Sequence, residues 1–511
     1  MSKSSTDEGE DHEQLISEKR PPCCCDAYQS DDPEKRVSPF AVVILLVLFL
    51  IYVLNQADRL VLPVSIPAGL RCHASVASQC NNTNFSNSAL EINLMNLPAS
   101  NKSEDCIEFN DEQQGLLTGP AFTVIYVVAG LPLARLADTR SRSVVLILGL
   151  LFWSAMVLLT GFVKEFWQLV VLRVLLGVGE ASCNPVAYSL VADFFPSNHR
   201  AFALSIYHYG VYLGGALGWM SGALNVILDW RWTFRILGIA GIVMAPITFI
   251  ALWEPKTVRK RRLERRKGKK VYSIKEVVLF LLKCPPYWVL LIAGSIRNIP
   301  GYALGAWLPT FFSRQYGVEA SHYAIPVGLV VLFGGGAGSF IGGFLSDRLS
   351  SRWANAKPFV IAAAQLLAAP CIMGVLLAPT PTMSYGFLFL AYLTAETWLG
   401  PAAAIVQDIC MPAMRSQASA IYIGVITVVA SLGPVLVPAL TDHIPLFDPC
   451  TVGVGYALLV IVPLFYVTSS ALFVVLGLVI HFWNKRIAAE EISYSVLDSD
   501  KLSGDDSDKS K

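Results

Sequence analysis

The sequence contains twelve apolar segments, each long enough to cross a membrane as a helix. A helix rises about 1.5 Å per residue, so about 20 apolar residues span a hydrocarbon core about 30 Å thick. Composition agrees, because 54% of the 511 residues are hydrophobic and only 15% are charged, against roughly 25% charged residues in soluble domains. We therefore predict an all-α membrane protein with twelve spans. They are 39–68, 114–137, 143–163, 166–194, 201–228, 233–253, 286–312, 324–346, 357–378, 384–410, 416–440 and 453–484.

The charges between the spans predict their orientation. Lysine and arginine are concentrated in 256–270, after the sixth span, and positive loops stay on the cytosolic side. Both termini then lie in the cytosol, because the number of spans is even, and the loop 71–112 lies outside or in a lumen. That loop carries glycosylation sequons at Asn81, Asn84 and Asn101, which are usable only on that side.

The two halves of the chain resemble each other in pattern. Glu180 and Pro185 recur as Glu396 and Pro401, both 216 residues later. This spacing predicts two pseudo-symmetric six-helix bundles, an arrangement common in transporters, with the solute site between them near mid-membrane. The expected segments are a disordered cytosolic tail 1–37, a first bundle 38–254 that includes the loop 71–112, a basic linker 255–285, a second bundle 286–485 and a cytosolic tail 486–511.

Charged motifs follow the second and eighth spans at matching places. They contain Asp138 and Arg142 in the first half and Asp347, Arg348 and Arg352 in the second. An aspartate at a helix end with arginines nearby can clamp neighbouring helix ends in one state and release them in another. We interpret these residues as cytosolic gates, although the positive-inside rule alone would also place arginines there.

Four cysteines are assigned to the outer side, Cys72, Cys80, Cys106 and Cys450. They are disulfide candidates, and the sequence does not rank their three possible pairings.

These features resemble the major facilitator superfamily. The resemblance rests on twelve spans, a basic central loop and the repeated loop motif, and it covers about residues 38–485. Within the superfamily, Asn55–Arg59, Gln114–Leu117, Gly177–Ser182 and Asp229–Trp232 resemble the Spinster family. This resemblance implies a lysolipid or sphingolipid transporter, several relatives being proton-linked, in which spans one, four, seven and ten line the cavity.

All four of these spans carry charged residues. Because a charge at mid-membrane costs about 2.5–3.5 kcal/mol on insertion scales, these side chains should pair and face a polar interior. Arginine keeps its proton and suits an anionic head group, whereas a carboxylate can bind and release a proton. Our hypothesis places proton coupling on Asp58, Glu180, Arg59 and Arg173, and substrate binding on Arg297 and Glu396, with Tyr302, Trp398 and His208 as further candidates. The alternative is a static ion-pair network that fixes helix register.

Both tails, which we otherwise expect to be disordered because of their polar composition, carry short motifs that resemble sorting signals. Leu15 and Ile16 complete an acidic dileucine motif, and Tyr494 and Leu497 form a tyrosine-based motif. Together they favour a lysosomal or late endosomal membrane over the plasma membrane, with sorting adaptors as partners. The glycosylated loop could dock a lumenal accessory subunit.

The expected function is proton-coupled transport of a lysolipid or another amphiphilic or anionic organic solute, with no cofactor and no nucleic-acid partner. The alternatives are a carrier of a small polar solute, such as a sugar, amino acid, dipeptide or carboxylate, and a receptor or scaffold of transporter shape. An enzyme is not expected, because no zinc-ligand or nucleophile–base pair has useful spacing.

Overall fold

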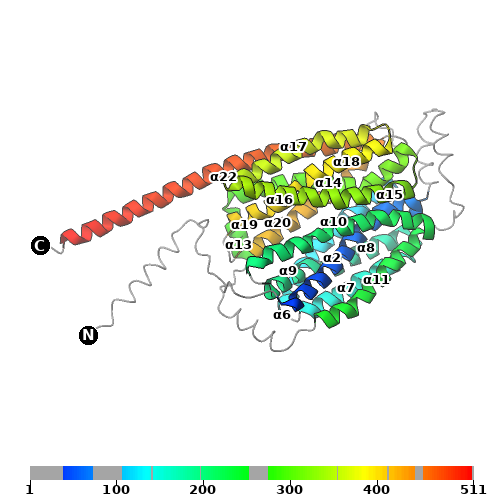
Figure 1. Ribbon diagram of the computed structural model, residues 1–511, viewed down its shortest axis with the longest axis horizontal. Coiled ribbons are helices and arrows are strands. Elements are labelled where there is room, and N and C mark those ends of the chain that lie inside the picture. The colour runs from blue at the N-terminus through cyan, green and yellow to red at the C-terminus, as the bar shows by residue number, and fades with distance from the viewer. Residues whose placement is uncertain are drawn as a thin grey trace.

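The computed structural model describes residues 38–72, 106–139, 142–195, 197–252, 274–353, 355–410, 414–443 and 453–508. In these ranges the regular elements are helices, and the single β-type bridge joins Arg71 to Ile107. The helices lie side by side in one elongated bundle (Figure 1). The predicted all-α membrane fold is confirmed.

The first half of the described chain runs from residue 38 to residue 252. Its helices are α2 (Pro39–Ser65), η1 (Ile66–Leu70), α5 (Asp111–Thr118), α6 (Pro120–Thr139), α7 (Arg142–Thr160), α8 (Phe166–Glu180), α9 (Cys183–Phe194), α10 (Ser197–Leu228) and α11 (Trp230–Ala251).

The second half runs from residue 274 to residue 508. Its helices are α13 (Ile274–Leu282), α14 (Pro285–Tyr316), α15 (Ala320–Leu329), η2 (Val330–Gly335), α16 (Gly336–Ser350), α17 (Ala356–Leu377), α18 (Pro381–Ala395), η3 (Glu396–Trp398), α19 (Leu399–Ile409), α20 (Arg415–Ala430), α21 (Gly433–His443) and α22 (Gly453–Asp508). The short helix α13 lies in the segment predicted to be a linker.

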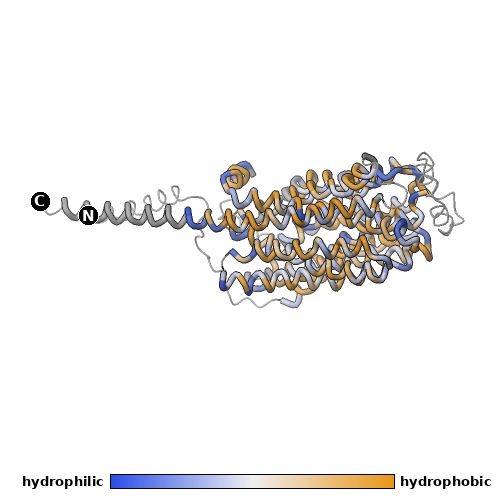
Figure 2. The backbone as a smooth tube through the Cα atoms, turned by 90° about the horizontal axis from the view of Figure 1, so that it is seen from above, coloured by the Kyte–Doolittle hydropathy of each residue, from blue (hydrophilic) through white to orange (hydrophobic). Residues whose placement is uncertain are grey.

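Eleven helical segments of the described chain are long and apolar enough to cross a membrane. The other predicted span, 114–137, corresponds to α5 and α6, which meet at the non-helical residue Gly119. Apolar residues dominate along the helices of the bundle (Figure 2). This distribution is the one expected for a bundle whose outer surface faces lipid.

One span in each half is broken at a glutamate. The helix α8 ends at Glu180 before α9 begins, and α18 gives way to η3 at Glu396. Pro185 and Pro401 follow five residues later in each case. A proline has no N–H and clashes with the carbonyl four residues before it, so a helix bends there. These two prolines are consistent with the helix breaks at both glutamates.

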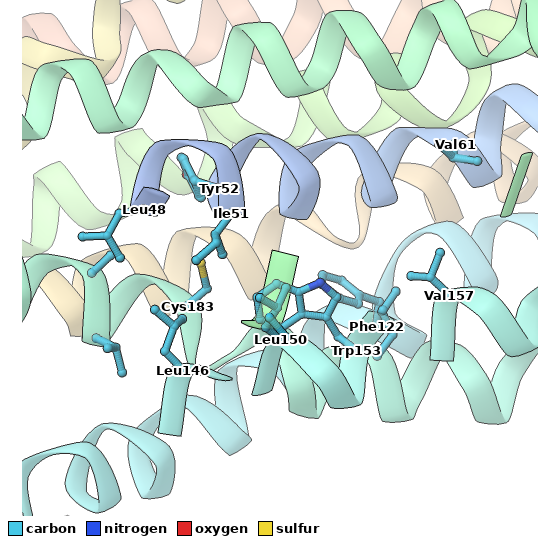
Figure 3. Close-up of a cluster of buried hydrophobic side chains, with 14 of the residues drawn as sticks. Leu48, Ile51, Tyr52, Val61, Phe122, Leu146, Leu150, Trp153, Val157 and Cys183 are labelled. Atoms are coloured by element: carbon cyan, nitrogen blue, oxygen red, sulfur yellow. The ribbon is translucent and has the colours of Figure 1, made fainter. Parts of the chain in front are cut away.

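The core of the first half is apolar and closely packed. Leu48 and Ile51 of α2, Leu146 and Trp153 of α7 and Cys183 of α9 are buried within it (Figure 3). The helix α8 approaches α7 closely at Gly179, where a Cβ would lie 2.8 Å from Trp153 Cβ. Such small residues allow helices to pack tightly in a membrane, and this packing fixes the position of Glu180 beside α2.

The C-terminal tail differs from its prediction. The expected unstructured segment 486–511 is helical as far as Asp508, because α22 continues past the bundle (Figure 1). The physical reason lies in the sequence, which has no proline after Pro463 and no glycine between Gly477 and Gly504, and alanine, glutamate and leucine favour a helix. The motif residues Tyr494 and Leu497 lie in this helix. The tail 1–37 with Leu15 and Ile16, the sequons and Cys80 and Cys450 lie outside the described residues.

Candidate functional site

An ion pair joins the first and fourth predicted spans in the interior of the first half. Arg59 Nε of α2 donates to Glu180 Oε2 at the end of α8 over 3.0 Å. The Glu180 side chain is 0% exposed, whereas that of Arg59 is 21% exposed. The Arg59 guanidinium lies 5.0 Å from the ring centre of Phe122 and 4.8 Å from that of Tyr126, both in α6. Ring faces attract a cation, so the charge points into the bundle and away from lipid.

Asp58 and Arg173 lie next to this pair. Arg173 Nη1 approaches the backbone carbonyl of Asp58 at 3.5 Å, so the guanidinium meets the main chain of α2. Both residues are buried. In the described part of the chain, Asp58 Oδ1 and Glu180 Oε1 have no hydrogen-bond partner. A buried carboxylate oxygen without a partner is costly when charged, and binding a proton removes that charge. The cluster therefore offers two carboxyl groups suited to hold a proton.

A second ion pair joins the seventh and tenth predicted spans. Arg297 Nη2 of α14 donates to Glu396 Oε1 over 3.1 Å and to the Ala395 carbonyl over 2.6 Å. The Arg297 guanidinium also lies 4.4 Å from the ring centre of Trp398. The Tyr212 hydroxyl of α10 donates to Glu396 Oε2 over 3.3 Å. Glu396 therefore connects helices of the two halves.

The two pairs occupy matching spans but differ in exposure. Arg59 and Glu180 are 121 residues apart, and Arg297 and Glu396 are 99 apart; the difference of 22 residues reflects the longer loop after α2. In the first pair the arginine is the partly exposed partner. In the second pair Arg297 is 3% exposed and Glu396 is 22% exposed. The partly exposed member of each pair is therefore a cation in the first half, Arg59, and an anion in the second half, Glu396.

The other substrate-binding candidates lie in different surroundings. Tyr302 of α14 is half-buried and lies near Arg59. Trp398 is buried beneath Arg297, and its ring N–H has no hydrogen-bond partner among the described residues. His208 of α10 packs against three tyrosine rings, at 5.5 to 6.2 Å between ring centres. These neighbours give His208 an aromatic environment distinct from the two ion pairs.

The gate candidates of the two halves lie in different surroundings. Asp347, Arg348 and Arg352 are exposed at the end of α16, and no salt bridge to them is found among the described residues. Arg142 is buried, and its Nη1 donates to the Ser189 carbonyl of α9 over 3.0 Å. Asp138 lies in α6, and its side chain is outside the described part.

A third charged cluster was not anticipated from the sequence. Asp111 at the start of α5 forms ion pairs with Arg71 and with Arg314 of α14. Burial alone would raise the pKa of the Asp111 carboxyl, but Arg314 and Arg71 outweigh burial and lower that pKa to about 2. Arg71, Asp111 and Arg314 lie at the ends of predicted spans, where charged residues are common, so the sequence does not single them out. The available sequence signal was Cys72, a disulfide candidate next to Arg71. Of the candidate cysteines, Cys72 and Cys106 form a disulfide.

No group of three His, Cys, Asp or Glu side chains that could hold a metal ion is found in the described ranges. The side chains described at the central site are arginines, carboxylates and aromatic rings.

Comparison with known proteins identifies the fold and the family. The family model described as Major Facilitator Superfamily matches residues 48–438. The chain is 27% identical over 361 residues to protein spinster homolog 3 of Danio rerio, covering 66% of this chain and 71% of that protein. It is 28% identical over 333 residues to the sphingosine-1-phosphate transporter SPNS2 of Xenopus tropicalis, covering 61% of this chain and 63% of that protein.

A solved structure has the same fold. It is that of a bacterial homologue of the human lysosomal transporter Spinster in an inward-facing, unoccupied conformation, with a TM-score of 0.63 and 24% identity, covering 88% of this chain and 98% of that one. The family model alone spans most of the membrane-embedded chain. The protein therefore belongs to the major facilitator superfamily, is a transporter and not an enzyme, and within that superfamily is Spinster-like.

Proposed function

We propose that the protein is a proton-coupled secondary transporter that moves an amphiphilic or anionic organic solute, most specifically a lysophospholipid or sphingoid lipid, by alternating access. The observation that carries the proposal is the buried cluster of Asp58, Glu180, Arg59 and Arg173, in which two carboxylate oxygens have no partner among the described residues. Arginine retains its proton, so a proton that enters this cluster binds a carboxylate.

Proton binding and solute binding are linked through Arg59. When Glu180 is charged, it holds the Arg59 guanidinium at 3.0 Å. When Glu180 takes a proton, that ion pair is lost, and the Arg59 guanidinium, whose Nη2 is buried and has no hydrogen-bond partner among the described residues, becomes available. It can then bind a phosphate or carboxylate through two parallel hydrogen bonds. A protonated Glu180 and a bound anion therefore favour each other, which is the thermodynamic requirement for symport.

The second pair contributes the opposite wall of the site. Arg297 is already held by Glu396, the Ala395 carbonyl and the Trp398 ring, so its role is to orient Glu396. The partly exposed Glu396 faces the polar part of the solute. The rings of Phe122, Tyr126 and Trp398 offer apolar surface to an acyl chain. Similarity to a sphingosine-1-phosphate transporter supports an amphiphilic solute.

We propose a lysosomal or late endosomal membrane as the location. The motifs at Leu15 and Ile16 and at Tyr494 and Leu497 support it, with sorting adaptors as the partners that read them, and so does the likeness to the bacterial homologue of a lysosomal transporter. An acidic lumen would supply the protons that drive solute toward the cytosol. In this orientation the sequons at Asn81, Asn84 and Asn101 face the lumen and carry glycans, and an accessory subunit could dock there.

Uptake into proteoliposomes under an imposed pH gradient tests the coupling. Glu180→Gln should abolish the gradient-driven component, because glutamine cannot exchange a proton. Asp408→Asn is the matched control, since Asp408 is exposed and pairs with Lys357 within the second half. Gradient dependence that persists in folded Glu180→Gln protein would exclude the proposed role of Glu180.

Metabolite profiling of lysosomes with and without the protein tests the solute class. Accumulation of lysophospholipids or sphingoid lipids on its loss supports the proposal. Accumulation of a sugar, an amino acid, a dipeptide or a carboxylate would instead assign the protein to small polar solutes.

A further inference from the structure

A buried ion cluster lies at the end of the bundle assigned to the lumen or exterior. Arg314 of α14 holds both oxygens of Asp111, with Nη2 to Oδ1 at 2.9 Å and Nη1 to Oδ2 at 3.2 Å. Arg71, which follows η1, pairs with the same carboxylate. Arg71 and Asp111 are at most 8% exposed. Charge-assisted, bidentate pairs of this kind are among the strongest polar contacts in proteins.

This cluster crosses between the halves. Asp111 and Arg71 belong to the first half, and Arg314 belongs to the second. A further cross-half hydrogen bond runs from Gln114 Nε2 of α5 to Thr310 Oγ1 of α14 over 3.1 Å. The carboxylate of one half and the guanidinium of the other therefore have to separate before this end can open.

The backbones beneath the cluster are in direct contact. A Cβ on Gly115 would lie 2.7 Å from the Pro434 carbonyl oxygen, and a Cβ on Gly119 would lie 2.4 Å from the Ser431 carbonyl oxygen. Real Cβ contacts are not this short, so the glycines allow α5 to rest on the junction of α20 and α21. The two halves are therefore in direct backbone contact at these two glycines.

A disulfide joins the two first-half segments that carry Arg71 and Asp111. Cys72 is adjacent to Arg71, and Cys106 lies five residues before Asp111. Two backbone hydrogen bonds reinforce the link, from the Cys72 N–H to the Ile107 carbonyl at 3.1 Å and from the Ile107 N–H to the Leu70 carbonyl at 2.9 Å. The bridge thus ties the end of α2 to the start of α5 and fixes Arg71 against Asp111.

At the opposite end of the bundle, the ion pair found among the described residues lies within one half. Among the described residues, the Lys357–Asp408 pair there joins α17 to α19 within one half, and Asp408 is 62% exposed. The cross-half ion pair found among the described residues is therefore that of Asp111 with Arg314, at the outer end.

We propose that Arg71, Asp111 and Arg314 form the outer gate of this transporter, and that the Cys72–Cys106 disulfide positions the first-half members of that gate. Arg314 is the member whose release separates the halves. Arg71 and the disulfide are positioning elements that act through Asp111. The role of this gate depends on the proposed alternating-access function, but the opening of the gate can be measured without a solute.

Labelling of a buried cysteine from the outer side tests the gate. Ser431→Cys is a small change at a residue that is 1% exposed beneath the cluster. Its rate of reaction with a membrane-impermeant maleimide is measured in sealed vesicles with the outer face accessible, and the background is measured on the parent protein. Adding Arg314→Gln should raise this rate on the order of tenfold, the population change that corresponds to about 1.4 kcal/mol.

Three further variants separate a gate from general loosening. Arg71→Gln should raise the rate less than Arg314→Gln, because Arg314 still spans the halves. Cys72→Ser with Cys106→Ser should raise it measurably, because Asp111 is then less well held. Lys357→Gln, at the opposite end, should leave it unchanged.

If the labelling rate is equal with and without Arg314→Gln, in protein that remains monodisperse, the proposed gate is refuted. A labelling increase with Lys357→Gln as large as that with Arg314→Gln would also overturn it, since loosening would then be unspecific. Because no solute is used, failure to find a proton-coupled solute would refute the proposed function and leave the gate result standing.

Discussion

Replacing Glu180 with glutamine should destabilise the first half measurably, because it leaves the charge of Arg59 without its partner. Removing one member of a buried ion pair costs about 3–5 kcal/mol. Arg59 is 21% exposed, and it keeps the faces of Phe122 and Tyr126, each worth about 0.5–1 kcal/mol. Both effects reduce the penalty, so we expect a loss of about 2–3 kcal/mol.

A double-mutant cycle isolates the pair. Arg59→Gln alone leaves the Glu180 carboxylate fully buried and should cost about 3 kcal/mol or more. The double variant carries neither charge, so its cost should lie well below the sum of the two single costs, with a coupling of about 2 kcal/mol. The measurement is denaturant unfolding in detergent micelles, followed by the intrinsic fluorescence of the tryptophans.

The pair Lys357 and Asp408 provides the control cycle. It has a shorter N–O distance, 2.6 Å, but Asp408 is 62% exposed, so water screens it and its coupling should be about 0–1 kcal/mol. Additive costs for Arg59→Gln and Glu180→Gln would refute the reasoning. A coupling at Lys357 and Asp408 as large as at Arg59 and Glu180 would do the same, because burial would then not set the magnitude.

Further predictions concern packing, pH, sorting and glycosylation. Gly342→Ala should cost about 1–3 kcal/mol and slow transport, because the new Cβ would lie 2.1 Å from the Thr397 carbonyl oxygen next to Glu396. Gly343→Ala, with nothing within 4 Å, should do neither. Asp111 has a pKa of about 2 against an ordinary 3.8, so its ion pairs should contribute on the order of 2 kcal/mol above about pH 4. This contribution should be lost as the pH falls toward 2, and Asp111→Asn should remove it from the pH profile of unfolding. Alanine at Leu15, Ile16, Tyr494 and Leu497 together should move the protein to the plasma membrane by fluorescence microscopy. Glutamine at Asn81, Asn84 and Asn101 should abolish the mobility shift produced by a glycosidase.

The fold could be predicted from the sequence because membrane spans obey a strong constraint. A segment in lipid must be long, apolar and internally hydrogen-bonded, so span limits follow closely from hydropathy. The helix breaks could be placed by Pro185 and Pro401. The helical continuation of α22 to Asp508 was missed because polar composition suggested disorder, while local helix propensity favoured the helix.

The site could be predicted only as a set of charges. The cost of charge in lipid indicates that Arg59, Glu180, Arg297 and Glu396 need polar surroundings, but it does not choose among partners. Tyr212 was missed because a tyrosine in a span is ordinary, and its contact with Glu396 depends on how the halves meet. The outer gate was missed for a related reason. Arg71, Asp111 and Arg314 lie at span ends, where charged residues are common and the sequence does not indicate which of them pair.

The repeat in the sequence equates the two ion pairs, yet the structure makes them physically different. A spacing of 216 residues relates Glu180 to Glu396, and both sit at helix breaks against an arginine. Glu180 is fully covered and has one unpaired oxygen in the described chain, whereas Glu396 is partly exposed and is bonded on both oxygens. A group that changes its proton must be shielded enough for the charge to matter, and a group that meets a solute must be reachable. In our proposal, the difference in burial therefore assigns proton exchange to Glu180 and solute contact to Glu396. We predict that Glu180→Gln changes the pH dependence of transport. Glu396→Gln should instead change the apparent affinity for the solute.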